Sequence, residues 1–236
     1  LVSQGNRIIS SSIYFPGEEP GDGTGVASQA INDAFNNGTL FVQAAGNFAN
    51  QHYDGVYYEG LLNNDTHNFG AGITVDEVKD MVGTYSQFET IRVTLRWSAW
   101  DEVDDRNYDL LLVRFNSGTG QYDVVDVGAQ GQDNQNGNAN VRPIERIVYN
   151  IPAGQGGTYG FRIIANGANK THTLDLTGNN RLPFEAPVPA RSLVDMASGL
   201  HAFSVAAVDA VSPFTHPAFS SRGPIRGPGG VIGGGT

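Results

Sequence analysis

The chain has 236 residues and no cysteine, so it is long enough to bury a core without disulfides. The lack of cysteine excludes a disulfide scaffold, a thiolate metal site and cysteine-based catalysis. Its 14 Lys and Arg against 24 Asp and Glu give a net charge of −10, so neither nucleic acid nor an anionic membrane is an expected partner. The 31 glycines and only 16% charged residues are typical of a turn-rich, β-rich secreted protein, and we expect a secreted or cell-envelope location.

Residues 1–50 show the pattern of a βαβ unit. An apolar run predicts a buried strand over residues 7–14, and a 3.6-residue apolar period predicts a helix over residues 26–35 with Thr24 as its N-cap. A nearly continuous apolar strand follows at residues 40–45. Strand, helix and strand with short links predict a right-handed crossover within a parallel sheet.

The apolar period changes to two after residue 51. In one run, alternate apolar side chains are expected to face a core, namely Ile91, Val93, Leu95 and Trp97. Arg92 and Arg96 lie between them and are expected to face solvent. Similar runs occupy residues 108–115, 122–127, 144–151, 158–164 and 171–176. Short strands joined by polar turns predict an all-β antiparallel sandwich of the jelly-roll kind.

The last stretch returns to the character of the first. An apolar strand at residues 202–208 leads to Phe219-Ser-Ser-Arg-Gly-Pro224 and a tail rich in glycine. We therefore predict an insertion, in which residues 1–50 and 190–236 form one discontinuous, incomplete α/β domain and residues 51–189 form the inserted sandwich. The chain opens with Leu1 and no leader, as expected for the interior of a longer protein.

Asn47 is the first candidate for chemistry. It follows the predicted strand in Val42-Gln-Ala-Ala-Gly-Asn47, at the carboxyl end of a parallel strand, where α/β folds place their ligands. Gly46 permits an unusual backbone conformation there. A neutral amide N–H donor at this place suits a developing oxyanion, whereas the alternative is an asparagine that only closes a turn.

Four segments together resemble the subtilisin-like serine proteases, the subtilases. These are Ile8-Ile-Ser-Ser-Ser12, the strand ending in Ala44-Ala-Gly-Asn47, Phe203-Ser-Val-Ala-Ala-Val208 and the Phe219–Pro224 motif, in the family's order. The insert also resembles the pre-peptidase C-terminal type of β-sandwich, through Trp97, Tyr108-Asp-Leu-Leu-Leu112 and Gly157-Thr-Tyr-Gly160.

The resemblance implies a secreted endopeptidase with a Ser-His-Asp triad whose members lie outside this chain. It makes Asn47 the oxyanion donor, and it places an extended substrate along Ser12, Ile13 and Tyr14. It also assigns Ala44, Ala45 and Gly46 to one wall of the pocket that holds the substrate residue before the scissile bond. Tyr14 departs from the family's usual glycine, so its ring would narrow the groove or the alignment is off by one. Gln43 is expected at a surface edge.

An acidic cluster raises the question of a metal. Asp101, Asp104, Asp105 and Asp109 offer oxygen ligands that could hold Ca²⁺, although the EF-hand template fails because Leu110 stands at its glycine position. The alternative is an acidic turn that enters a strand. No cofactor is otherwise required.

The remaining polar motifs are expected to be structural. Each of the five histidines is expected at the surface or in a turn: His52, His67, His172, His201 and His216. Gly21-Asp-Gly-Thr-Gly25 precedes the predicted helix, but its spacing fits no phosphate-binding loop, and turn formation with helix capping is expected.

Two functions stay open at this stage. The first is part of a secreted subtilisin-like endopeptidase that acts on protein or peptide and supplies the oxyanion donor and part of the groove. The second is a non-catalytic module, in which the acidic sandwich binds protein or glycan on a pseudo-protease scaffold.

Overall fold

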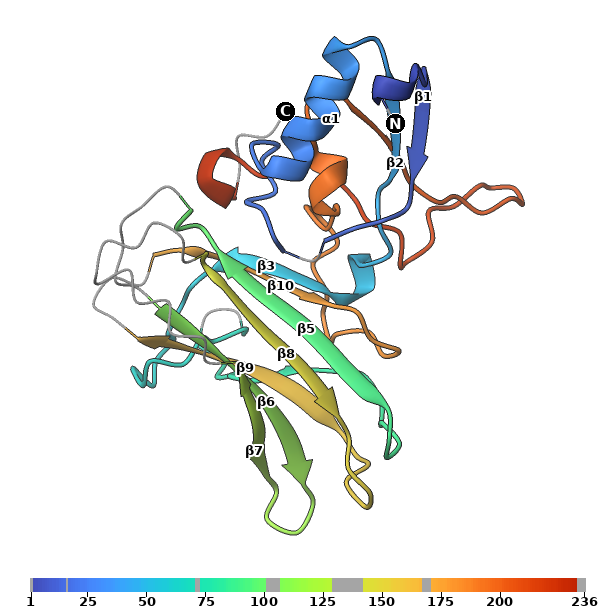
Figure 1. Cartoon of the computed structure of the whole chain (residues 1–236). Coiled ribbons are helices and arrows are strands. Elements are labelled where there is room, and N and C mark those ends of the chain that lie inside the picture. Colours follow the sequence, from blue (N-terminus) through green and yellow to red (C-terminus); the bar gives the residue numbers. More distant parts are fainter. Residues whose placement is uncertain are drawn as a thin grey trace.

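The computed structural model describes residues 2–15, 17–70, 73–100, 107–128, 142–166 and 171–232. Figure 1 shows an α/β part, built from the two ends of the chain, above a β-sandwich built from the middle. Within the described ranges, no helix has the length and apolar character to cross a membrane.

A three-stranded parallel sheet forms the α/β part. Its strand order is β1-β2-β11, made of Ile8–Ser11, Leu40–Ala44 and Ala202–Val205. Helix α1, Val26–Asn36, connects the first two strands, so the predicted order of strand, helix and strand is confirmed. The prediction of a buried strand over residues 7–14 is wrong in part, because β1 is shorter and its residues are exposed or half-buried. β11 pairs with β2 in parallel, which brings the two ends of the chain onto one sheet as predicted. Short 3₁₀ helices complete this part and its borders: η1 Val2–Gln4, η2 Ala49–Gln51, η4 Asp195–Ser198 and η5 Pro228–Gly230.

The N-terminus of α1 is capped differently from the prediction. Gly25 occupies the N-cap position, and Thr24 donates to Asp22 instead, at 2.6 Å. The carboxylate of Glu19 accepts hydrogen bonds from the backbone N–H groups of Ala27 and Ser28. The Glu19 carboxylate thus accepts from the free N–H groups and places a negative charge at the positive end of the helix dipole. It occupies the position that a bound phosphate would take at this helix.

Within the described residues, eight antiparallel strands form the sandwich. They are β3 His52–Val56, β4 Lys79–Asp80, β5 Thr90–Trp97, β6 Asn107–Asn116, β7 Gln121–Gly128, β8 Ile144–Asn150, β9 Tyr159–Asn166 and β10 Thr173–Gly178. The two sheets have the orders β3-β10-β5-β8 and β4-β9-β6-β7. Numbered along the sandwich, these orders are 1-8-3-6 and 2-7-4-5, the arrangement of a double-Greek-key jelly roll. The fold is thus a mixed α/β part joined to a β-sandwich.

The core of the sandwich lies between its two sheets. Ile91, Val93, Leu95 and Trp97 are all buried there, as the alternation predicts, and Arg92 is exposed. Arg96 contradicts the prediction, because it is only 6% exposed. Its side chain points away from the sandwich core, on the outer face of β5. The α/β part covers that face at this position, so Arg96 is buried between the two parts.

Candidate active site

The backbone at the end of β2 is held in one conformation. Gly46 has φ of +110°, and a Cβ there would lie 2.6 Å from Val194 and 2.9 Å from the Ser221 hydroxyl. Ser221 is tied to this turn twice: its N–H donates to the Gly46 carbonyl at 2.9 Å, and its Oγ accepts from the Phe48 N–H at 3.0 Å. The position therefore requires glycine.

Asn47 lies at the tip of this turn with its side chain exposed. No hydrogen bond joins its side chain to another described residue, whereas Ser221 and Val194 hold the backbone on both sides of it. The turn is therefore closed by other residues, and the amide of Asn47 is available to a ligand. The held backbone fixes the place from which this amide can donate, and a donor so placed suits a developing negative charge.

The neighbouring segment of the predicted groove is partly open. Ser12 and Ile13 are exposed and follow β1, which pairs with β2 and is an edge of the described sheet. An open edge of this kind can pair with an extended peptide. The expectation for Gln43 is wrong: it is fully buried in the central strand, and its Nε2 donates to the Ile13 carbonyl at 3.0 Å.

Tyr14 turns toward the sandwich. Its ring packs edge-on against Phe48 with centroids 4.9 Å apart, and its hydroxyl accepts a hydrogen bond from Asn179 at the end of β10. Burial raises the pKa of the Tyr14 phenol above its ordinary value. Of the three residues predicted to form a pocket wall, Ala45 is buried, and Ala44 and Gly46 are half-buried.

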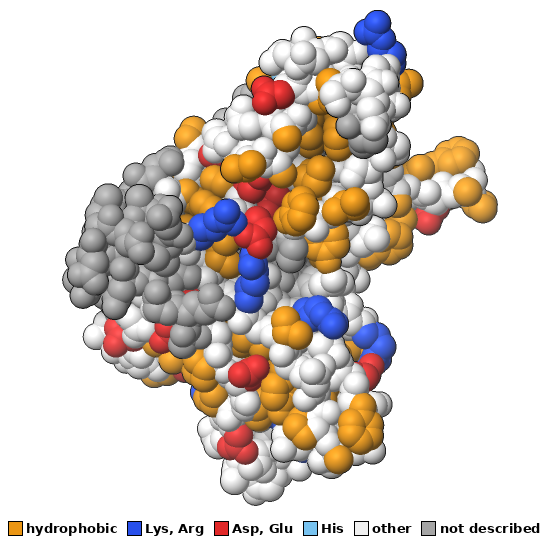
Figure 2. All heavy atoms as spheres, in the orientation of Figure 1, with side chains coloured by type: hydrophobic (Ala, Val, Ile, Leu, Met, Phe, Trp, Pro, Cys, Tyr) orange, Lys and Arg blue, Asp and Glu red, His pale blue; other side chains and the backbone are white. Residues whose placement is uncertain are grey.

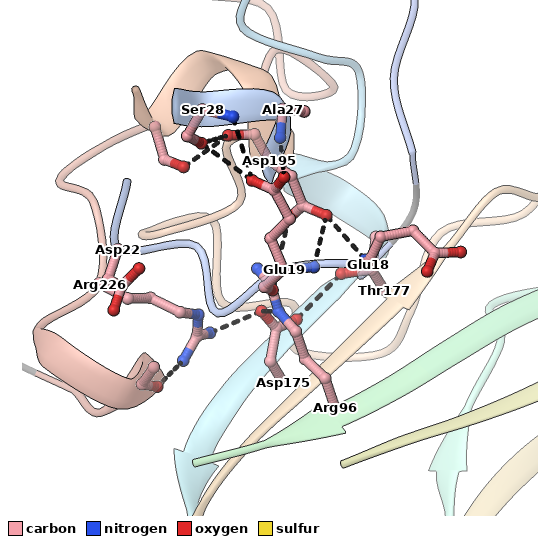
Figure 3. A network of polar contacts seen from close by, with 12 residues as sticks. Glu18, Glu19, Asp22, Ala27, Ser28, Arg96, Asp175, Thr177, Asp195 and Arg226 are labelled. Carbon is pink, nitrogen blue, oxygen red and sulfur yellow. Dashed lines mark hydrogen bonds and ion pairs between the residues drawn. The ribbon is translucent and has the colours of Figure 1, made fainter. Parts of the chain in front are cut away.

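A buried network of charges joins the α/β part to the sandwich (Figure 3). The Arg96 guanidinium contacts Asp175 at 2.7 Å and Asp195 at 2.6 Å, and the Asp195 carboxylate also accepts from the Glu18 N–H. Arg226 contacts the same Asp175 at 2.8 Å. Although burial favours a neutral acid, these arginines and His52 hold the pKa of Asp175 well below its ordinary value. Asp175 is therefore a buried carboxylate, stabilised by charges from both parts.

A second pair of contacts strengthens the same interface. Asp54 on β3 pairs with Arg226 at 2.7 Å and with Arg191. Both arginines come from the returning segment of the chain, so the segment after the sandwich is fastened to its first strand. Nothing in the sequence patterns indicated this network, because Arg96 and Asp175 occupy the polar side of alternating strands.

Three histidines contradict the expectation of a surface or turn position. His52, His67 and His172 are 1%, 0% and 4% exposed, while His216 is exposed and His201 is half-buried. His52 forms a His–Asp pair with Asp175 at 3.2 Å, and its other ring nitrogen lies 2.5 Å from the Val188 carbonyl. Both nitrogens are engaged by the protein, so His52 has no atom free to act on a substrate.

The calcium prediction falls mostly outside the described residues, since Asp101, Asp104 and Asp105 lie there. Asp109 is described, and it accepts from Asn107 at 3.1 Å and from Asn166 at 2.6 Å. Among the residues whose positions are described, no three acidic or histidine side chains gather as a metal site would require.

The fold and site define an α/β protein with an inserted jelly roll and an exposed asparagine at the end of its central parallel strand. No family model matches the chain, and no curated protein matches it in sequence. Among solved structures it is similar to the Clostridium perfringens CspB protease, with a TM-score of 0.55 and 16% sequence identity. The match covers 96% of this chain and 46% of that protein, so the chain spans about half the length of its structural neighbour. Because only 16% of the residues are identical, the similarity concerns the fold alone.

Proposed function

We propose that this chain is part of a subtilisin-like serine endopeptidase, in which Asn47 donates a hydrogen bond to the oxyanion of the tetrahedral intermediate. The nucleophile, base and orienting acid would come from other parts of the protein. A solved structure whose match covers 96% of this chain is that of a protease, which supports the assignment.

The exposed amide of Asn47 is the observation that carries this proposal. It stands at the end of the central strand of a parallel sheet, on a turn that Gly46, Ser221 and Val194 hold without its help. Electrostatic stabilisation requires a donor that needs no rearrangement when the charge develops. Ser12 and Ile13 lie at the open edge of the same sheet, where a peptide can be held in an extended form.

The test is Asn47→Leu in the whole protein that carries this chain. Because the donor acts on the tetrahedral state, kcat should fall about a hundredfold or more while KM changes little; that magnitude is taken from subtilisin itself. Titration of active sites with a covalent fluorophosphonate gives kcat per folded molecule. Asn36→Leu, an exposed substitution at the end of α1, is the matched control and should leave kcat unchanged.

Two results would contradict the proposal. An unchanged kcat per titrated site would make Asn47 a turn residue. A whole protein that neither cleaves peptides nor reacts with the fluorophosphonate would favour the non-catalytic binding module instead. Residues 1–236 by themselves should not be labelled, since the proposed nucleophile lies elsewhere.

A further inference from the structure

Ser221 contacts the turn of Asn47 on both sides of that residue. Its backbone N–H donates to the Gly46 carbonyl at 2.9 Å, and its hydroxyl oxygen accepts from the Phe48 N–H at 3.0 Å. The serine lies 173 positions after Phe48, so the tertiary fold brings it to this turn. Asn47 is exposed, whereas Ser221 is only 1% exposed. Ser221 is therefore covered by the protein, and Asn47 is the residue that a ligand can reach.

The two hydrogen bonds hold the two peptide planes that meet at the Asn47 Cα. A peptide group is planar, so the Gly46 carbonyl oxygen lies in one plane with the N and Cα of Asn47. The Phe48 N–H lies in the next plane, together with the Cα and carbonyl carbon of Asn47. A residue whose two flanking planes are held has little freedom left in φ and ψ, so the direction of its Cα–Cβ bond is set. Ser221 therefore determines the point from which the Asn47 amide extends.

Other hydrogen bonds hold the two ends of the same turn. The Val194 N–H donates to the Ala45 carbonyl at 3.0 Å, and the Ala49 N–H donates to the Phe219 carbonyl at 3.0 Å. Ser221 acts on the residues between these ends. An alanine in its place would keep the backbone N–H and remove only the hydroxyl. The ends of the turn would then stay fastened, while the peptide plane that faces the hydroxyl is released.

We propose that Ser221 is a positioning residue for the reaction, which acts through Asn47 by fixing the backbone that carries the oxyanion donor. The inference rests on the proposed endopeptidase function and adds a residue to it. A donor stabilises the oxyanion only if it lies within hydrogen-bond distance when the charge develops. A displacement of about 1 Å can lower a rate about a hundredfold. The Ser221 hydroxyl therefore contributes to the rate although it is buried away from the substrate.

The preceding residue, Ser220, offers a matched control. It is also fully buried, and its hydroxyl oxygen accepts from the Ala207 N–H at 3.0 Å, in the segment after β11. Ser220→Ala removes the same chemical group, with the same burial and the same type of partner, from the same motif. Comparison with Ser221→Ala therefore separates an effect on Asn47 from a general effect on stability.

The experiment measures kcat and KM of the whole protein, with active sites titrated to completion by the fluorophosphonate. Ser221→Ala should lower kcat per titrated site about ten- to a hundredfold and change KM little, because the donor acts on the tetrahedral state. Ser220→Ala should leave kcat per titrated site unchanged. Ser221→Cys keeps a weaker acceptor of similar shape, so its kcat should lie between those of the wild type and Ser221→Ala. If the alanine variant does not fold, the cysteine variant is judged by the same criteria.

A double-mutant cycle with Asn47→Leu decides whether Ser221 acts through Asn47. Once the amide is absent its position no longer matters, so Ser221→Ala should cause no further loss of kcat in that background. An equal loss with and without Asn47, an equal loss in Ser220→Ala, or no loss in Ser221→Ala overturns the positioning role while the endopeptidase stands. If Asn47→Leu leaves kcat unchanged, or the whole protein neither cleaves peptides nor is labelled, the proposed function fails and the positioning role fails with it.

Discussion

The sandwich and the parallel sheet differ in how well each covers its own apolar surface. The sandwich encloses a continuous core between its sheets, with Trp97, Tyr108, Tyr159 and Phe161 all buried. The described α/β part has a small buried cluster of Phe48, Val194 and Ala197. Its strands leave large side chains uncovered: Ile8 is 66% exposed, Phe203 61% and Leu40 41%. Figure 2 shows hydrophobic side chains over this part and along the segment that projects after β11.

This difference indicates that the two parts are stabilised in different ways. α1 lies against one face of this sheet, and a contiguous apolar patch left uncovered marks a surface that makes contacts. We therefore expect the sandwich to provide most of the stability of this chain.

Trp97→Ala tests the core of the sandwich. Trp97 is 2% exposed and packs edge-on against Tyr108 with ring centroids 5.4 Å apart. Its removal leaves a cavity and should lower the free energy of unfolding by about 3–5 kcal/mol. Arg92→Ala, on the exposed side of the same strand, should change it by no more than about 0.5 kcal/mol. Denaturant unfolding measures both, and equal effects would mean that β5 is in a different register.

Arg96→Ala tests the interface between the two parts. The substitution leaves Asp195 without its arginine and Asp175 with Arg226 and His52 alone, in a buried place. Loss of one partner of a buried ion pair typically costs about 3–5 kcal/mol, and we expect the lower end because Arg226 remains. Lysine should restore only part of the loss, since it lacks the planar fork that reaches two carboxylates.

Limited proteolysis gives the same substitution a second readout. If the network fastens the α/β part to the sandwich, Arg96→Ala should speed cleavage near residues 50 and 190 and leave the sandwich intact. Uniform acceleration across the whole chain would mean that Arg96 stabilises the sandwich itself, and the interpretation of the interface would be wrong.

His67 connects the stability of the sandwich to pH. The Tyr58 N–H donates to its Nδ1 at 3.1 Å, so the ring proton sits on Nε2, 2.8 Å from the Tyr53 hydroxyl. Burial, together with the charge of Lys79, lowers the pKa of His67 to about 3. The unfolded chain has a value of about 6.5, so the unfolded state binds a proton first as the pH falls. The stability that the folded state gains by keeping His67 neutral is complete above a pH of about 6.5 and is lost as the pH falls toward about 3.

The expected loss is about 3 kcal/mol between pH 7 and pH 4, from 1.36 kcal/mol for each unit of difference in pKa. Unfolding curves at several pH values measure it. His67→Gln should be less stable at pH 7 and should flatten this part of the pH profile. A profile that stays equally steep in the variant would assign the titration to another group.

The sequence was informative where burial alone decides the pattern. The alternation in β5 and in five other strands predicted elements that the structure confirms, because one face of each strand meets the sandwich core. Their number and polar turns predicted a sandwich of the jelly-roll kind, and the observed sheet orders are those of a jelly roll. β3 was missed because its alternate residues His52 and Asp54 are polar and yet buried.

Three of the errors, at Arg96, Gln43 and His52, share one physical cause. Polar residues that are buried between two layers have the same pattern in the sequence as residues that face water. Arg96, Gln43 and His52 all belong to this class, and their partners come from distant segments. The turn around Asn47 was predicted from Gly46, whereas Ser221, which holds it, could be found only through the motif at residues 219–224.

Phe203→Ser tests the uncovered sheet, where the smallest effect is expected. Phe203 lies on β11, an edge of the described sheet, and its side chain is mostly exposed. In residues 1–236 alone, the substitution should change the free energy of unfolding by no more than about 0.5 kcal/mol. It should also reduce self-association, measured by sedimentation, because an open edge with apolar side chains invites pairing between chains. In the whole protein, where we expect a further layer over this sheet, the same substitution should cost about 1.5–3 kcal/mol, the value of a buried phenylalanine. Equal small effects in both would mean that the sheet is open in the whole protein as well, and that its apolar surface serves contacts between molecules.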